Sequence, residues 1–208
     1  VSNNFRLLNL FSSRMRNREL NNAYQNLLMI AEGYDKRYNY YYSSDYRYYG
    51  MPNNFSLGGT PLNDTIVVAK SVIEEFRMKT RAQIVNAVFL TDGQSNQHNE
   101  YLDSSNVVRT FSRNSIHIDD PATRMRVFPE EVKRQNSRVT SLLLLALKRS
   151  LGINLLGFFL TSGSGRRSMG NLSYAMSRYP TDEDYSMFRK EKFLIDSETA
   201  YDELYIIN

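Results

Sequence analysis

The chain has 208 residues, of which 26 are Lys or Arg and 22 are Asp or Glu, and it contains no Cys. This length predicts one domain, and a hydrophobic share of 41% supplies enough apolar side chains for a core. The absence of Cys excludes a disulfide scaffold, thiolate-bound zinc, an iron–sulfur cluster and thiol catalysis, and two His residues are too few for a multi-histidine site. A chain without Cys also fits a cytoplasmic compartment best. No apolar run approaches the roughly 20 residues of a membrane span, so we expect no membrane partner.

The first part of the chain combines helical spacing with a tyrosine-rich stretch. Apolar residues recur at helical spacing between residues 4 and 31, which predicts one helix, or two helices broken near Asn17. Residues 34–50 then contain eight Tyr among polar residues and are expected to be an insertion. A protein-contact loop and a platform on which nucleic-acid bases stack both fit this composition.

The rest of the chain alternates helices with short apolar strands. Helical spacing predicts helices over residues 66–76, 142–148 and 169–176, and apolar runs predict strands over residues 84–90, 153–160 and 193–195. Residues 95–137 are expected to be an irregular insertion, and residues 200–207 close the chain. The run at 84–90 is typical of a strand buried on both faces of a parallel sheet. The alternation predicts an α/β fold, namely a doubly wound, Rossmann-like, mostly parallel sheet with helices on both faces.

Two loops carry the residues that suit metal chemistry. In the loop at residues 56–62, two glycines allow a sharp turn, and we expect Thr60 to be the N-cap of the next helix with Pro61 at its first position. In the second loop, Asp92 and Gly93 follow a predicted strand, at the end where open α/β sheets bind their ligands. Taken alone, Asp92 fits a turn cap equally well.

Taken together, the two loops resemble those of the von Willebrand factor A (VWA) domain. The resemblance lies in Gly-Gly-Thr-Pro-Leu at residues 58–62, then a helix, then a strand that ends in Leu-Thr-Asp-Gly at residues 90–93. It implies that Thr60 coordinates a divalent ion through its hydroxyl and that Asp92 adds a carboxylate, directly or through water. Hard oxygen ligands completed by water suit Mg²⁺ or Mn²⁺. The glycines that would support these loops are Gly58, Gly59 and Gly93.

One motif of the VWA family is missing. Its first motif, Asp-x-Ser-x-Ser, should lie upstream of the helix that begins near Asn4, and no such motif occurs there. Two explanations stay open. Residues 1–208 are a single VWA-like domain that lacks its N-terminal part, or the site is degenerate and binds no ion. The first explanation predicts the motif roughly 30 to 70 residues before Val1, by typical element lengths.

Within the VWA superfamily, several segments resemble the CobT-type cobaltochelatase subunit and its bacteriophage relatives. They are residues 5–15, 58–63 and 201–205, whereas residues 34–50 and 95–137 fall outside the resemblance. The resemblance implies a non-ATPase subunit that docks onto a ring of AAA+ ATPases of the CobS or MoxR type, where an acidic side chain of the partner completes the metal coordination. The assembly would insert a metal ion into a tetrapyrrole or remodel another target, in the host cytoplasm if a phage encodes it.

Other residues suggest weaker hypotheses. No nucleophile lies in a pattern with a base, so we expect no catalysis by the chain alone and at most a non-catalytic subunit of an ATP-dependent metal chelatase. Arg166 and Arg167 follow a glycine-rich turn and fit either partner docking or a solvated turn. His117 beside two carboxylates fits a metal ligand or a surface hydrogen-bonding cluster.

A second class of function also stays open. The segment Arg124–Arg149 has seven basic and two acidic residues, which fits a solvated helix face or a docking surface for an acidic ATPase or nucleic acid. A degenerate VWA module could use that surface and the tyrosines to bind single-stranded RNA, or could be part of a virion.

Overall fold

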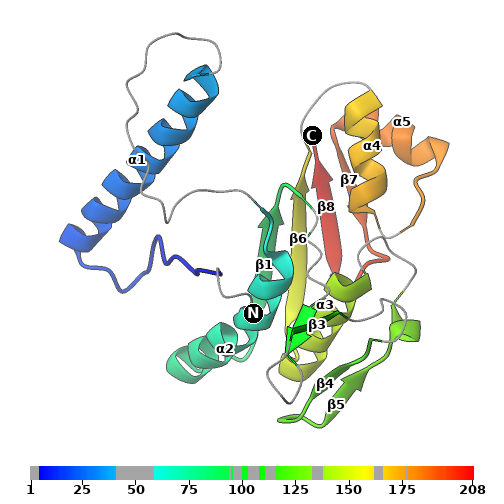
Figure 1. Cartoon of the computed structure of the whole chain (residues 1–208), viewed down its shortest axis with the longest axis horizontal. Coiled ribbons are helices and arrows are strands. Elements are labelled where there is room, and N and C mark those ends of the chain that lie inside the picture. Colours follow the sequence, from blue (N-terminus) through cyan, green and yellow to red (C-terminus); the bar gives the residue numbers. More distant parts are fainter. Residues whose placement is uncertain are drawn as a thin grey trace. The chain divides into compact units, whose positions relative to one another are not determined.

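The computed structural model of the chain describes residues 5–40, 59–93, 95, 100–102, 108–110, 116–132, 138–161, 166–176 and 178–208. The chain divides into two units, residues 6–58 and residues 59–208 with the first five residues, and Figure 1 shows the elements of both.

The smaller unit contains one long helix, α1 (Asn17–Tyr40). The backbone N–H of Arg16 donates to the Glu19 carboxylate at 2.8 Å, which holds the entry to this helix. Residues 6–12 form no helix, so the helix predicted from residue 4 is wrong for its first part and correct from Asn17, where the break was placed. The Ser12 hydroxyl accepts from the backbone N–H of Arg14 at 3.2 Å, and such local bonds compete with helix formation. Residues 41–58, which include most of the tyrosine-rich stretch, lie outside the described residues.

The larger unit is built on a four-stranded sheet with the order β1-β6-β8-β7. Its strands are β1 (Asn86–Thr91), β6 (Asn154–Leu160), β7 (Phe193–Asp196) and β8 (Glu203–Ile207). Strands β1, β6 and β8 are parallel, and β7 is antiparallel to β8 at one edge. This arrangement confirms the predicted α/β class and the mostly parallel sheet.

Four helices accompany the sheet. They are α2 (Leu62–Thr80), α3 (Arg138–Leu151), α4 (Arg166–Ala175) and α5 (Asp182–Glu191). The first three confirm the predicted helices, although each is longer or shifted. The sequence analysis missed α5, whose N-cap is Thr181 in a capping box with Asp184. In the part of the chain that the structure describes, no helix combines the length and apolarity that crossing a bilayer requires.

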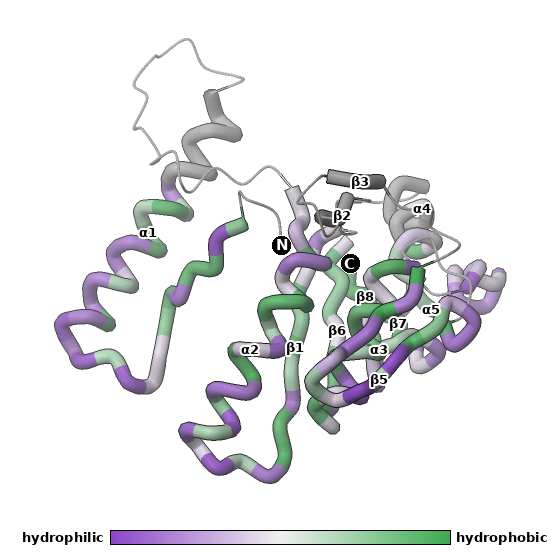
Figure 2. Tube along the Cα trace, turned by 60° about the horizontal axis from the view of Figure 1, so that its bottom comes forward, coloured by the Kyte–Doolittle hydropathy of each residue, from purple (hydrophilic) through white to green (hydrophobic). Residues whose placement is uncertain are grey.

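The helices share one apolar core with a single face of the sheet. In the strand register, Phe89 pairs with Gly157 and Gly157 with Leu204, so these three residues lie on the same face. Apolar residues of all four helices belong to the same cluster as that face, for example Ile66 of α2 and Phe188 of α5. Figure 2 shows such hydrophobic residues in green on α2, α3 and the strands.

The opposite face of the sheet has no helix on it among the described residues of this unit. Val88 and Leu90 of β1 are 58% and 68% exposed, so the prediction of a strand buried on both faces is wrong. The chain passes from β1 to β6 to β8 in one direction across the sheet. Right-handed crossovers that all advance in the same direction place their helices on the same face, which explains why the predicted helices on both faces are not found here.

The expected insertion contains short pairs of strands. β2 (Glu100–Leu102) pairs with β3 (Val108–Thr110), and β4 (Ile118–Asp120) pairs with β5 (Met125–Val127), followed by a 3-10 turn, η2 (Pro129–Glu131). The β4–β5 hairpin packs on α3 through a second apolar cluster that includes Val127 and Leu142. Lys70 of α2 donates to the carboxylate of Asp120 at 2.6 Å, so the hairpin is also joined to α2.

Candidate metal centre

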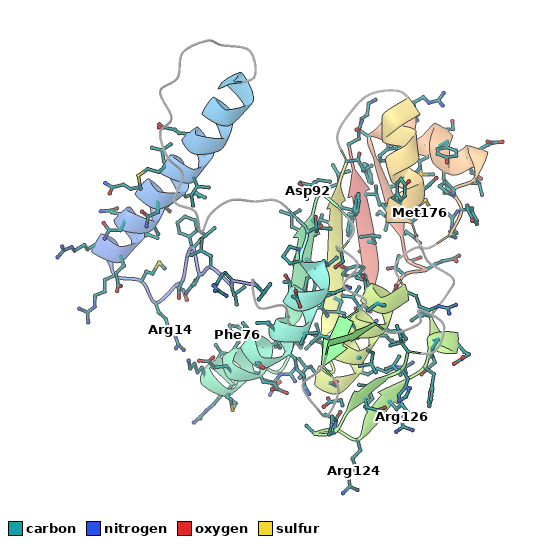
Figure 3. All side chains as sticks on the ribbon, in the orientation of Figure 1. Arg14, Phe76, Asp92, Arg124, Arg126 and Met176 are labelled. Carbon is teal, nitrogen blue, oxygen red and sulfur yellow. The ribbon has the colours of Figure 1, made fainter. Side chains whose placement is uncertain are left out.

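The loop before α2 and the loop after β1 meet through Thr60 and Gly93. A Cβ placed on Gly93 would lie 3.0 Å from the Thr60 hydroxyl oxygen, which is closer than ordinary van der Waals contact. Gly93 directly follows Asp92, which is exposed and lies at the carboxyl end of β1 (Figure 3). The structure therefore brings together the two loops that carry the candidate hydroxyl and the candidate carboxylate.

Thr60 is not the N-cap of α2, contrary to the sequence prediction. The N-cap is Pro61, and its side chain accepts no capping hydrogen bond. The backbone N–H of Asn63, which a local cap would satisfy, instead donates to the Ser95 hydroxyl at 3.0 Å. Because Ser95 lies beyond the end of β1, this long-range cap fastens the start of α2 to the second loop and leaves the Thr60 hydroxyl for other contacts.

A second bond extends this connection to α3. The Thr140 hydroxyl, in the first turn of α3, donates to the side-chain oxygen of Asn63 at 2.7 Å. Ser95 and Thr140 are 5% and 6% exposed, so both bonds lie in a region with little water. Asn63 thus connects the starts of α2 and α3 with the loop after β1, all at the carboxyl end of the parallel strands.

The backbone on both sides of Asp92 is held by Thr91. The Thr91 hydroxyl donates to the carbonyl oxygen of Gly93 at 2.7 Å and accepts from the Gly93 N–H at 3.2 Å. These two bonds fix the turn that follows β1. A turn fixed in this way presents the Asp92 carboxyl group at a defined place with little loss of backbone entropy on binding.

The residues around this turn fit a hard divalent ion in part. The donors are a hydroxyl and a carboxylate, the oxygen types that Mg²⁺ and Mn²⁺ take, and Gly93 leaves room beside the Thr60 hydroxyl that a Cβ would fill. Over the described ranges, no three His, Cys, Asp or Glu side chains gather as a metal cluster. An ion held by Thr60 and Asp92 would need further oxygen ligands from water, a partner or other residues.

The remaining predicted loop residues add little to this centre. Gly59 lies in an exposed bend, and Gly58 lies outside the described residues. Arg166 and Arg167 begin α4, and the positions of their side chains are outside the described part of the structure. The glycine-rich turn at residues 162–165 is also outside it.

The His117 group is a hydrogen-bonded cluster on the β4–β5 hairpin. Arg126 donates to both carboxylate oxygens of Asp119, at 2.6 and 3.1 Å, and His117 lies 3.5 Å from the same carboxylate. The hydrogen bond from Arg126 lowers the pKa of Asp119. The second neighbouring acid, Asp120, is held by Lys70 and Thr123, which place its pKa well below the usual range. Both acids therefore stabilise the hairpin.

The basic segment Arg124–Arg149 is partly neutralised within the chain. Arg126 pairs with Asp119, Lys148 with Asp202 and Arg149 with Glu131, and the last two distances are 2.5 Å. Half of the residues of helix α3 in this segment are buried, so the helix is not simply a solvated face. These ion pairs reduce the positive charge that the segment offers to an external partner.

The sequence analysis missed Asn63, Ser95 and Thr140 as organisers of the centre. Asn63 had been seen only as the end of a loop motif, and Ser95 had been placed in an irregular insertion. Their partners lie 32 and 77 residues away in the sequence, beyond the reach of local capping patterns.

No protein-family profile, no curated protein and no solved structure matches this chain.

Proposed function

We propose that the chain is a VWA-type, metal-ion-dependent protein-interaction module that serves as the non-ATPase adaptor of an AAA+ ATPase complex of the CobS or MoxR type. In this function the chain is a cobaltochelatase-like subunit that has no catalytic activity of its own. The observation that carries the proposal is the approach of the Thr60 hydroxyl to the backbone of Gly93, beside Asp92. That approach brings the loop that carries the Thr60 hydroxyl against the residue that follows Asp92.

Three further features support the proposal. The two loops lie at the carboxyl end of parallel strands, where open α/β sheets bind ligands. Their backbones are fastened by the bonds of Thr91 and Asn63, so the centre is organised before a partner arrives. The ion pairs of Arg126, Lys148 and Arg149 leave less free positive charge for nucleic acid, which favours the metal-dependent module over an RNA-binding one.

Thr60 and Asp92 would hold the ion, and Mg²⁺ or Mn²⁺ would supply a positive centre that an acidic side chain of the partner can bind. One carboxylate leaves a divalent ion short of negative charge, so the ion favours an Asp or Glu from outside. Gly93 keeps space beside Thr60, and the bond from Asn63 to Ser95 keeps the second loop in place.

The test is a binding measurement with the full chain immobilised and a purified MoxR-type AAA+ ATPase in solution. We expect binding in Mg²⁺, release by EDTA, and a loss of about tenfold or more in affinity for Asp92→Ala, which corresponds to about 1.4 kcal/mol. Asp92→Asn should be nearly as harmful, because it preserves the shape of the side chain and removes its charge.

Asp182→Asn is the matched control, because Asp182 is an exposed acid on α5. It should leave binding unchanged. Binding of the ATPase that persists in EDTA and in Asp92→Ala would rule out metal-dependent docking.

A further inference from the structure

The larger unit contains a cavity of about 70 Å³ between α3 and α4, over β6 and β8. One end of this α3–α4 cavity is formed by Thr91, Gly93 and Ser95 of the candidate metal loop. Its remaining lining is mostly apolar and comes chiefly from Leu62, Leu144, Phe159, Met176, Tyr201 and Leu204. Figure 3 labels Met176, which follows α4 and lines the cavity, and Asp92, which follows β1 between the lining residues Thr91 and Gly93.

Three hydroxyls of the lining, those of Thr91, Ser95 and Thr140, already make hydrogen bonds within the chain. A hydroxyl has one proton to donate, and Thr91 gives its proton to the carbonyl of Gly93 while Thr140 gives its proton to Asn63. The Ser95 hydroxyl already accepts from the N–H of Asn63. A bound water needs two to four polar partners, so these committed groups favour an apolar occupant.

The volume limits that occupant to a short aliphatic group. An apolar cavity of about 150 Å³ holds benzene, so a cavity about half that size holds a group of about three carbons. The space exists because its walls contain small residues, among them Ala175 and Ala200. A branched side chain at either position would fill it.

The charges near the cavity favour an acidic partner segment. Thr140 and Ser141, in the first turn of α3, line the cavity, and that turn contains Arg138 and no acidic residue. The N-terminal end of a helix carries partial positive charge, and Arg138 adds to it. Asp92, the proposed metal ligand, is exposed and lies between Thr91 and Gly93, which both line the cavity. A partner carboxylate bound to the ion would therefore lie near the cavity.

We propose that the α3–α4 cavity receives a short aliphatic side chain, of alanine to valine size, that neighbours the metal-binding carboxylate in the partner protein. This inference rests on the proposed function and names the partner's recognition element, an Asp or Glu with a small aliphatic residue at a fixed distance along the chain. The cavity selects the partner by size, and the ion selects it by charge.

The first test uses xenon as a probe of the cavity in the full chain, with methyl-labelled Ala and Met observed by NMR. Xenon pressure should shift the methyl resonances of Ala175, Ala200 and Met176, and Ala200→Leu should abolish the shifts of the other two. Gly170→Leu is the control, because Gly170 is exposed on α4 and has open space beyond its Cβ. If Ala200→Leu does not fold, Ala175→Val fills the same space. Absence of xenon shifts in the native chain would overturn the proposal.

The second test selects nonapeptides with one fixed Asp and random flanking residues against the full chain in Mg²⁺. Ala or Val should be enriched at one fixed offset from the Asp, and Ala200→Leu should weaken those peptides about tenfold while keeping their EDTA sensitivity. EDTA-sensitive, Asp-dependent peptides with no preferred offset would overturn this proposal and leave the proposed function standing. Peptides that ignore EDTA would overturn both.

Discussion

The Thr140 hydroxyl donates to the side-chain oxygen of Asn63 at 2.7 Å, across 77 residues of sequence. This bond fixes the first turn of α3 to the first turn of α2. The N–H of Asn63 is also bonded to Ser95. Asn63 therefore joins the start of α2, the start of α3 and the loop after β1 at the carboxyl end of the parallel strands, where the candidate metal loop lies.

Asn63→Ala should lower the free energy of unfolding by about 1–3 kcal/mol, because it removes the acceptor of a bond made by a buried hydroxyl. Urea unfolding followed by circular dichroism measures this loss. The comparison variant is Thr65→Ala, whose hydroxyl bonds to the Pro61 carbonyl at the exposed side of α2, and it should cost less than about 0.5 kcal/mol. Equal losses in the two variants would show that the buried Asn63 bond contributes no more to the free energy of unfolding than the exposed Thr65 bond.

Gly93→Ala should weaken the binding of Mn²⁺ without unfolding the protein. The new Cβ would stand 3.0 Å from the Thr60 hydroxyl oxygen and must displace it. Misplaced groups around a metal commonly cost about tenfold or more in metal affinity. Gly93 has no positive φ, so Ala fits the backbone and the free energy of unfolding should change by less than about 1 kcal/mol. Electron paramagnetic resonance of free Mn²⁺ measures the affinity, and unchanged affinity would remove Thr60 from the site.

Gly157→Ala should be destabilising by about 1–3 kcal/mol, as for other overpacked cores. A Cβ on Gly157 would lie 2.7 Å from a methyl of Leu204 and 3.0 Å from two ring atoms of Tyr201, and both neighbours are buried. The same substitution at Gly170, exposed within α4, should instead stabilise the protein by about 0.5–1 kcal/mol, because it removes backbone entropy from the unfolded chain. Thermal unfolding distinguishes the two signs, and a stabilising Gly157→Ala would contradict the packing described here.

The stability of the α5 cap should depend on pH. Arg178 donates to both carboxylate oxygens of Asp184, at 2.5 and 2.9 Å, and thereby holds the pKa of Asp184 well below its usual range. Because the folded pKa lies below the unfolded one, the stabilisation is present above about pH 4 and is lost as the pH falls toward the folded pKa.

Asp184→Asn should therefore cost about 2 kcal/mol at about pH 7 and less, but still a measurable amount, at about pH 2.5, because the folded carboxylate keeps most of its charge there. Urea unfolding at the two pH values gives the comparison. Asp182→Asn, at an exposed position of the same helix, should cost less than about 0.5 kcal/mol at both. A cost for Asp184→Asn that is independent of pH would mean that the carboxylate charge is not what stabilises the cap.

Three strands of the four-stranded sheet were predicted from the sequence, whereas β8, which lies between β6 and β7, was not. The apolar runs before Asp92 and before Thr161 each predicted a strand of the parallel sheet correctly, although only alternate residues of each strand face the core. The helix expected from residue 4 was wrong only for the residues before Asn17, because helical spacing does not register the competing hydrogen bond of Ser12. Helix α5 was missed because its apolar face is short, although Thr181 and Asp184 carried a capping signal.

For the candidate centre, the sequence predicted which two loops form it but not how they are held. Thr60 and Asp92 stood in recognisable loops, and the parallel arrangement places such loops at one edge of the sheet. The hydrogen bonds that hold these loops could not be predicted from the sequence. Ser95 caps a helix that begins 33 residues earlier in the chain, and Thr140 bonds to that same helix. The tertiary fold determines which of several nearby hydroxyls caps a helix. For this reason the Thr-Pro pair before α2 wrongly predicted Thr60 as the N-cap.

Among the described residues of the larger unit, the face of the sheet opposite the core carries exposed apolar side chains. Val88, Leu90, Leu160 and Ile195 are each 40% or more exposed, and they alternate with the strand residues that line the core. A contiguous apolar surface of this kind favours reversible association, which sulfate strengthens and cooling weakens. Light scattering of the chain should therefore rise with protein concentration more steeply in ammonium sulfate than in sodium chloride, and Leu90→Lys should flatten that rise.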